Sequence, residues 1–123
     1  MLTDAGKTYD IKPYGAFAMN AMRLEKGYRA WGADYTTERT PLETGMDRLI
    51  KTDGRQFTGR EAMLERAGSA DHWSMHLLSL DVEDIDPFYT HPIIDDGQAI
   101  GVVTSGAYGH RCGMALALSL IHI

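Results

Sequence analysis

The chain has little cysteine, little positive charge and no long apolar run. A single cysteine, Cys112, excludes an internal disulfide and fits a reducing compartment, either the cytoplasm or a mitochondrial matrix. Twelve basic residues against 17 acidic ones give a net charge of −5, which argues against a nucleic-acid or anionic-membrane surface. No stretch approaches the roughly 20 apolar residues of a membrane span. The acidic Asp4 stands where a signal peptide would be apolar.

What is present suffices for a folded core. The chain has 123 residues, of which 44% are hydrophobic, and this predicts one domain or slightly more than one. There are no internal repeats and no low-complexity segment.

The first half of the chain is predicted to be helical. Residues 2–9 form a short helix that ends near Asp10, and residues 14–25 form a second helix with Gly27 as its C-terminal cap. An apolar stripe at helical spacing is expected to face the core: Phe17, Ala21, Leu24 and Tyr28. Arg23 falls on the opposite, polar side, whereas Glu25 falls inside the apolar arc and needs a partner.

A long ordered loop is expected next, followed by a third helix. Residues 28–45 have no regular period, and residues 46–51 indicate a short strand or turn. Residues 59–66 are predicted to be helical and to end at Gly68. Thr58 followed three residues later by Glu61 predicts a capping box at the start of this helix.

The second half is predicted to form antiparallel strands. Residues 72–82 alternate loosely, with Trp73, Met75 and Leu77 on one face, and residues 81–86 are read as an acidic loop. Residues 92–94 and 99–103 flank Asp95-Asp96-Gly97, a strong hairpin signal, and residues 114–121 form a further strand. Helices followed by an antiparallel sheet predict the α+β class.

Four motifs occur in order: RLEKGYRAWG at 23–32, TTERTPLETG at 36–45, FTGREA at 57–62 and VTSGAY at 103–108. Together they resemble the C-terminal part of the glycine-cleavage T-protein superfamily. Within it, residues 2–118 most resemble the folate-binding region of the FAD-dependent dimethylglycine and sarcosine dehydrogenases.

The resemblance implies a fragment of a larger enzyme. Residues 1–45 would be the tail of a T-protein-like folate-binding domain, and residues 46–123 a truncated C-terminal antiparallel β-barrel. The parent would oxidise a methylated amine with FAD in an upstream domain, and tetrahydrofolate would capture the one-carbon unit. This chain would supply the wall and cap of the folate site, with no catalytic residue and no activity alone. An open sheet edge predicts marginal stability in isolation, and whether residues 119–123 are native stays open.

The resemblance also implies folate-pocket residues. Tyr28 and Trp31 are candidates to stack on a pterin ring, although aromatic residues in such a loop more often pack together. Glu43 follows the rigid Pro41 turn near the expected pocket. Arg48 stands where relatives often carry Tyr or Trp, and it is suited to pair with a carboxylate or to stack.

Several other polar residues have a predicted role that is structural. Arg23 is expected to meet a structural acid rather than a folate carboxylate, and Glu25 to accept backbone N–H groups of the loop at 28–36. Cys112 is expected to be small and buried. His72 and His76 share one face of a strand but lie roughly 13 Å apart, so no metal site is predicted.

One departure bears on the branch of the superfamily. T-proteins carry Ala-Arg-Asp before the RLE motif, and this chain has Ala18-Met19-Asn20. The Asn agrees with the dehydrogenases. Two alternatives remain: a flavin-free tetrahydrofolate-dependent aminomethyltransferase or demethylase, and a non-catalytic folate-binding module.

Overall fold

The computed structural model describes residues 1–69, 72–82 and 86–122. Helices α1 (Leu2–Gly6), α2 (Ala16–Glu25) and α3 (Arg60–Ala67) precede or flank a single sheet, and 3₁₀ turns η1 (Lys7–Tyr9) and η2 (Asp47–Leu49) lie between them. The strands are β1 (Trp73–Leu80), β2 (Pro92–Asp95), β3 (Gln98–Gly109) and β4 (Met114–His122). The predicted α+β class is confirmed. No helix of the described residues is long and apolar enough to cross a membrane.

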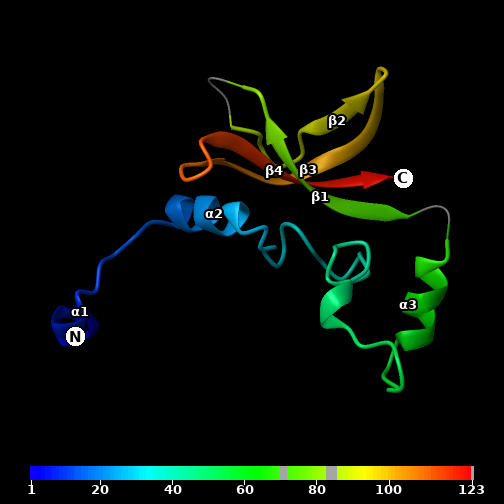
Figure 1. Cartoon of the computed structure of the whole chain (residues 1–123), viewed down its shortest axis with the longest axis horizontal. Coiled ribbons are helices and arrows are strands. Elements are labelled where there is room, and N and C mark those ends of the chain that lie inside the picture. Colours follow the sequence, from blue (N-terminus) through cyan, green and yellow to red (C-terminus); the bar gives the residue numbers. More distant parts are fainter. Residues whose placement is uncertain (70–71, 83–85, 123) are drawn as a thin grey trace.

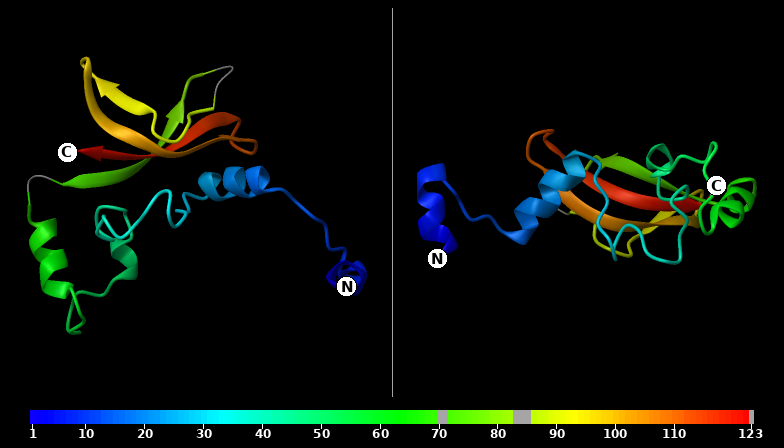
Figure 2. Two further views of the ribbon diagram at one scale, coloured as in Figure 1. Left: turned by 180° about the vertical axis from the view of Figure 1, so that it is seen from behind. Right: turned by 90° about the horizontal axis from the view of Figure 1, so that it is seen from below.

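The sheet is antiparallel and open, with the strand order β1-β4-β3-β2. Its central strand, β4, is buried from Ala115 to Leu120 because β1 and β3 flank it on both sides. Figure 1 shows α2 along one face of this sheet, while α1 lies apart from it at the end of an extended segment. Both views in Figure 2 place α3 near the end of the sheet that holds the C-terminus.

The core forms where α2 meets the sheet. Leu24, which has no exposed surface, packs with one face of the two strands β1 and β4. The buried core residues are Leu24, Met75, Leu116, Leu118 and Leu120. Alternate residues of β4 share a face, so this leucine triplet follows from the period of a strand.

The predicted hairpin is confirmed. Asp96 has φ 45° and Gly97 has φ 77°, and two positive φ values in a two-residue loop define the turn type that matches the twist of paired strands. The acidic loop predicted at 81–86 lies partly outside the described residues.

Three local predictions are wrong. Phe17 and Tyr28 are 93% and 61% exposed, so only Ala21 and Leu24 of the predicted stripe are buried. The N-cap of α3 is Gly59, and no side chain caps the helix, so the box expected from Thr58 and Glu61 does not form. Cys112 is exposed in the turn between β3 and β4, because the chain reverses there outside the sheet.

Candidate functional site

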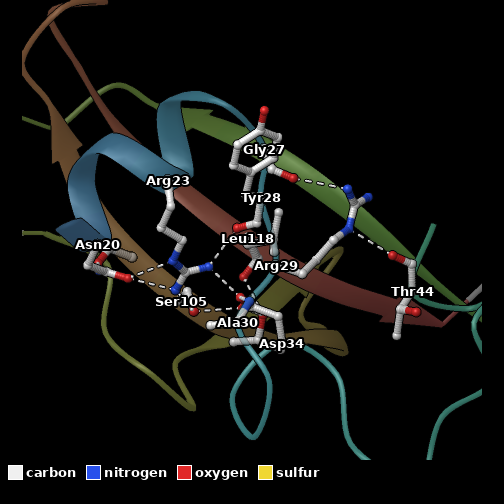
Figure 3. A network of polar contacts seen from close by, with 12 residues as sticks. Asn20, Arg23, Gly27, Tyr28, Arg29, Ala30, Asp34, Thr44, Ser105 and Leu118 are labelled. Carbon is white, nitrogen blue, oxygen red and sulfur yellow. Dashed lines mark hydrogen bonds and ion pairs between the residues drawn. The ribbon is translucent and has the colours of Figure 1, made fainter. Parts of the chain in front are cut away.

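The most densely connected polar group in the described residues is the buried carboxylate of Asp34 (Figure 3). It lies in the loop that follows α2 and is 1% exposed. Its Oδ1 accepts hydrogen bonds from the hydroxyls of Thr104 and Ser105, both at 2.6 Å. Its Oδ2 accepts from the backbone N–H of Ala30 at 2.7 Å and from Arg23 Nη1.

A bulge in β3 allows two consecutive hydroxyls to reach one carboxylate oxygen. Val103 pairs with Ser119 and Ser105 pairs with Leu118, so Thr104 is an extra residue in the strand. Successive side chains of a regular strand point to opposite faces, but a bulge redirects one of them. Thr104 Oγ1 also lies 3.1 Å from the carbonyl oxygen of Leu118, across the ladder.

Arg23 brings α2 into the same network. Its Nε and Nη2 donate to Asn20 Oδ1 at 2.9 and 2.6 Å, and Nη2 also donates to Ser105 Oγ at 2.6 Å. Its Nη1 donates to the Tyr28 carbonyl oxygen at 3.0 Å as well as to Asp34. The expectation of a structural acid as its partner is therefore confirmed, and the Arg23 side chain is 15% exposed.

Asn20 completes the network at the sheet. Its Oδ1 accepts from Arg23, and its Nδ2 donates to the carbonyl oxygen of Gly106 at 3.1 Å. The amide offers both an acceptor and a donor at this position, which a carboxylate does not. The whole cluster thus joins α2, the following loop and the β3 bulge, and its buried polar atoms are satisfied.

Glu25 anchors a different segment from the one predicted. Its Oε1 accepts the backbone N–H of Arg111 at 2.6 Å, in the turn between β3 and β4. The role as a backbone anchor is confirmed, whereas the loop at 28–36 as its target is wrong. Glu25 lies at the end of α2 facing this turn, a pairing between distant segments that periodicity does not reveal.

Glu43 is held by its own turn. Glu43 is 4% exposed. Its Oε2 accepts hydrogen bonds from Thr40 N at 2.8 Å and from Thr40 Oγ1 at 3.0 Å. In return, Thr40 Oγ1 lies 3.2 Å from Glu43 N. This reciprocal pair is a capping box, and the spacing Thr-Pro-Leu-Glu is its sequence signal. Arg66 Nη2 lies 3.4 Å from Glu43 Oε1 and ties α3 to the turn.

The hydrogen bonds of Glu43 control its ionisation. Burial by itself would raise the pKa of Glu43, but the Thr40 N–H and hydroxyl, the Arg66 charge and the Trp73 N–H together hold that pKa below its usual value. The carboxylate is thus anionic at neutral pH and fully engaged in structural contacts.

The structure distributes the four predicted folate-pocket residues over separate places. Tyr28 and Trp31 are 61% and 66% exposed, and the Trp31 ring meets Tyr35 edge-on, with centroids 5.3 Å apart. Arg48 is exposed in η2, and Glu43 is buried behind Arg66. Only the two aromatic residues belong to the same short loop.

Two clefts are present in the described part of the chain. The first, of about 870 Å³, lies between α2, β3 and residues 86–89, and its wall includes Phe17, Phe88 and Tyr108. The second, of about 950 Å³, lies between the loop at 49–59 and α3. None of the four predicted pocket residues lines either cleft. Sequence reasoning missed both, because a cleft depends on how separate segments pack together and not on a local pattern.

Comparison with known proteins agrees with this architecture. Residues 1–54 match the GCVT N-terminal domain, and residues 75–123 match the glycine cleavage T-protein C-terminal barrel domain. The chain is 32% identical to dimethylglycine dehydrogenase of Rattus norvegicus over 99% of its own length and 14% of that protein. It is also 32% identical to an aminomethyltransferase of Streptomyces avermitilis, over 98% of this chain and 33% of that one.

A solved structure shares the fold. The aminomethyltransferase T of the glycine cleavage system from Bartonella henselae superposes with a TM-score of 0.68 at 27% identity, over 85% of this chain and 30% of that chain. The chain therefore spans a third or less of the length of these relatives. With two consecutive domain matches and this shared fold, the chain belongs to the glycine cleavage T-protein superfamily.

Proposed function

We propose that this chain is part of a flavin-dependent dehydrogenase of N-methylated amines, of the dimethylglycine or sarcosine type. In this proposal residues 1–45 end the folate-binding domain and residues 46–123 begin the barrel that caps it. The region forms a wall and the cap of a tetrahydrofolate site. FAD and the amine bind to parts of the parent chain that precede these residues.

The observation that carries the proposal is the amide of Asn20. It bridges the Arg23 guanidinium and the Gly106 carbonyl oxygen, so its donor and its acceptor are both in use. An Asp here, as in the T-protein motif that the sequence resembles, keeps the acceptor for Arg23 but loses the N–H for Gly106. The amide thus supports the dehydrogenase branch, together with the match to dimethylglycine dehydrogenase.

The exposed aromatic residues of the loop after α2 fit a folate. Trp31 is 66% exposed and is held edge-on by Tyr35, which leaves much of its surface available for a flat heterocycle to stack on. Arg48 is exposed, and its planar guanidinium suits a ligand carboxylate. Glu43 fixes the turn at 40–45 through its hydrogen bonds with Thr40.

When bound, tetrahydrofolate supplies the amine that captures the one-carbon unit. The residues of this chain orient the ring system and exclude water from it, which are positioning contributions. The Asp34 network keeps the loop of Tyr28 and Trp31 fixed on α2, since Arg23 binds the Tyr28 carbonyl oxygen and Asp34 binds Ala30 N. A rigid loop lowers the entropy lost when a ligand binds.

The second candidate is a flavin-free aminomethyltransferase or demethylase with the same folate site. The match to the aminomethyltransferase of Streptomyces avermitilis and the Bartonella structure favour it. The two candidates differ in whether a flavin domain accompanies this region.

The test uses the parent protein purified from its source. A flavin absorbance band that bleaches when dimethylglycine or sarcosine is added under anaerobic conditions is expected. Trp31→Ala should leave this bleaching unchanged and weaken tetrahydrofolate binding by about fivefold or more, since stacking of a heterocycle on an aromatic side chain contributes roughly 1–3 kcal/mol. A parent that binds no flavin but transfers a one-carbon unit to tetrahydrofolate would reject the dehydrogenase.

A further inference from the structure

The second cleft has the size and lining of a ligand site. Its volume of about 950 Å³ falls within the roughly 300–1,000 Å³ of small-molecule pockets. Pro41, Leu49, Phe57 and Met63 give it an apolar wall, and the wall is contributed by the turn at 40–45, the loop at 49–59 and α3. Tyr28 and Trp31 do not line it.

The second cleft is lined by positive charge, although the chain as a whole is negatively charged. Lys51, Arg55 and Arg66 line it, and no Asp or Glu of the described residues does, although the chain as a whole carries −5. In the first cleft, by contrast, Glu25 and Asp86 accompany the basic residues. A concentration of one sign within a cleft strengthens the local potential.

Two of the three cations are available to a ligand. Arg66 lies 3.4 Å from the buried Glu43 carboxylate, so its charge is partly balanced. Lys51 and Arg55 are exposed and form no ion pair with any described residue. They belong to the same loop, which is fixed to α3 because Arg60 Nε and Nη2 donate to the Thr52 carbonyl oxygen at 2.9 and 2.6 Å.

The N-terminus of α3 adds to the same potential. Thr58 and Gly59 line the cleft, and the first turn has no side-chain cap. The positive end of the helix dipole acts in the same direction as Lys51 and Arg55, and Glu61, which lies in the first turn but does not line the cleft, offsets part of it. Its contribution is secondary to the two full charges.

We propose that this cleft binds a small organic dianion with an apolar body, of which an aromatic dicarboxylate is the simplest type. The apolar body contacts Leu49, Phe57 and Met63. One carboxylate accepts two parallel N–H bonds from Arg55, and the other pairs with Lys51. Tyr28, Trp31 and Arg48, the residues proposed to contact folate, do not line this cleft. The proposal therefore does not depend on the proposed function.

The probe is isophthalate, titrated into the isotope-labelled parent protein that contains this chain and followed by two-dimensional NMR. Saturable shifts are expected in residues 49–66 and not in residues 104–111 of the first cleft. Benzoate, with one carboxylate, should bind about tenfold more weakly, and added salt should weaken isophthalate binding.

Three variants test the charge of the cleft and its volume separately. K51Q/R55Q should weaken isophthalate binding by about tenfold or more, whereas K12Q/K26Q, with the same change in net charge, should bind as the unaltered chain does. Ala62→Phe keeps the cations but fills the cleft, and it should also abolish the saturable shifts. Spectra of the free variants show whether each is folded. Equal binding by K51Q/R55Q and K12Q/K26Q, or shifts that leave residues 49–66 unmoved, would overturn the proposal.

Discussion

Arg23 donates to the carboxylate of Asp34, 11 residues further along the chain; the Asp34 side chain is excluded from solvent and that of Arg23 is 15% exposed. The pair connects α2 to the loop that follows it, and the hydroxyls of β3 connect both to the sheet. Desolvating two charges is costly, and such a pair is retained only where further hydrogen bonds satisfy it. Here the Asp34 carboxylate accepts from four donors.

Asp34→Asn is expected to destabilise the chain by about 3–5 kcal/mol, since it leaves the buried Arg23 charge without its counter-ion. The amide also presents N–H groups to donors that require an acceptor. Urea unfolding followed by circular dichroism measures the change. Asp53→Asn, at an exposed loop position, is the matched control and should shift the free energy of unfolding by less than about 0.5 kcal/mol. Equal effects of the two substitutions would contradict a special role for Asp34.

Thr104→Val tests the bulge of β3. The substitution keeps the branched shape but removes the hydroxyl that donates to Asp34 Oδ1 at 2.6 Å. A loss of about 1–3 kcal/mol in the free energy of unfolding is expected, as for a buried hydrogen bond to a charged acceptor. Thr37→Val, at an exposed position, should be nearly neutral by the same measurement. A neutral Thr104→Val would mean that Ser105 alone satisfies Oδ1.

The fold class followed from patterns that are local in the chain. The strand predicted at 114–121 is found at Met114–His122, and the Asp96-Gly97 turn was also predicted, because alternation and positive-φ residues act over a few positions. Gly27, with φ 65°, was likewise predicted to end α2. The superfamily followed from four motifs in order.

The placement of polar residues on α2 could not be predicted in this way. A helical wheel places Arg23 on the polar side of the helix, but it does not identify Asp34, Ser105 and Asn20 as the residues that the guanidinium contacts. That assembly depends on an unpredicted bulge at Thr104, 70 residues from Asp34. Phe17 was predicted to be in the core but is exposed. A helical wheel shows which side of a helix is apolar, but it does not show whether another part of the protein covers that side.

Gly106→Ala is expected to displace the segment around Pro87, which packs against Gly106 of β3. A Cβ on Gly106 would lie 1.7 Å from the carbonyl oxygen of Pro87, a backbone atom that a side-chain rotation cannot move. Overpacking of this kind typically costs about 1–3 kcal/mol and occasionally more. Chemical unfolding should show that loss, and NMR should show altered signals for residues 86–91. Gly15→Ala is the control, because its Cβ would meet nothing within 4 Å; a loss of equal size there would contradict the proposed clash.

Glu43 should give the chain a specific dependence of stability on acid. Its pKa in the folded state is lowered from the ordinary value of 4.5, so the folded state binds its proton less readily than the unfolded state does. The resulting stabilisation is complete above the unfolded pKa and is lost as the pH falls through the lowered folded value. Glu43→Gln should therefore lower the free energy of unfolding at pH 7 and flatten its decline below about pH 5. Urea unfolding from pH 7 down to pH 3 tests this, with Glu38→Gln, an exposed neighbour in the same loop, as the control. An unchanged slope in Glu43→Gln would show that other carboxylates account for the acid sensitivity.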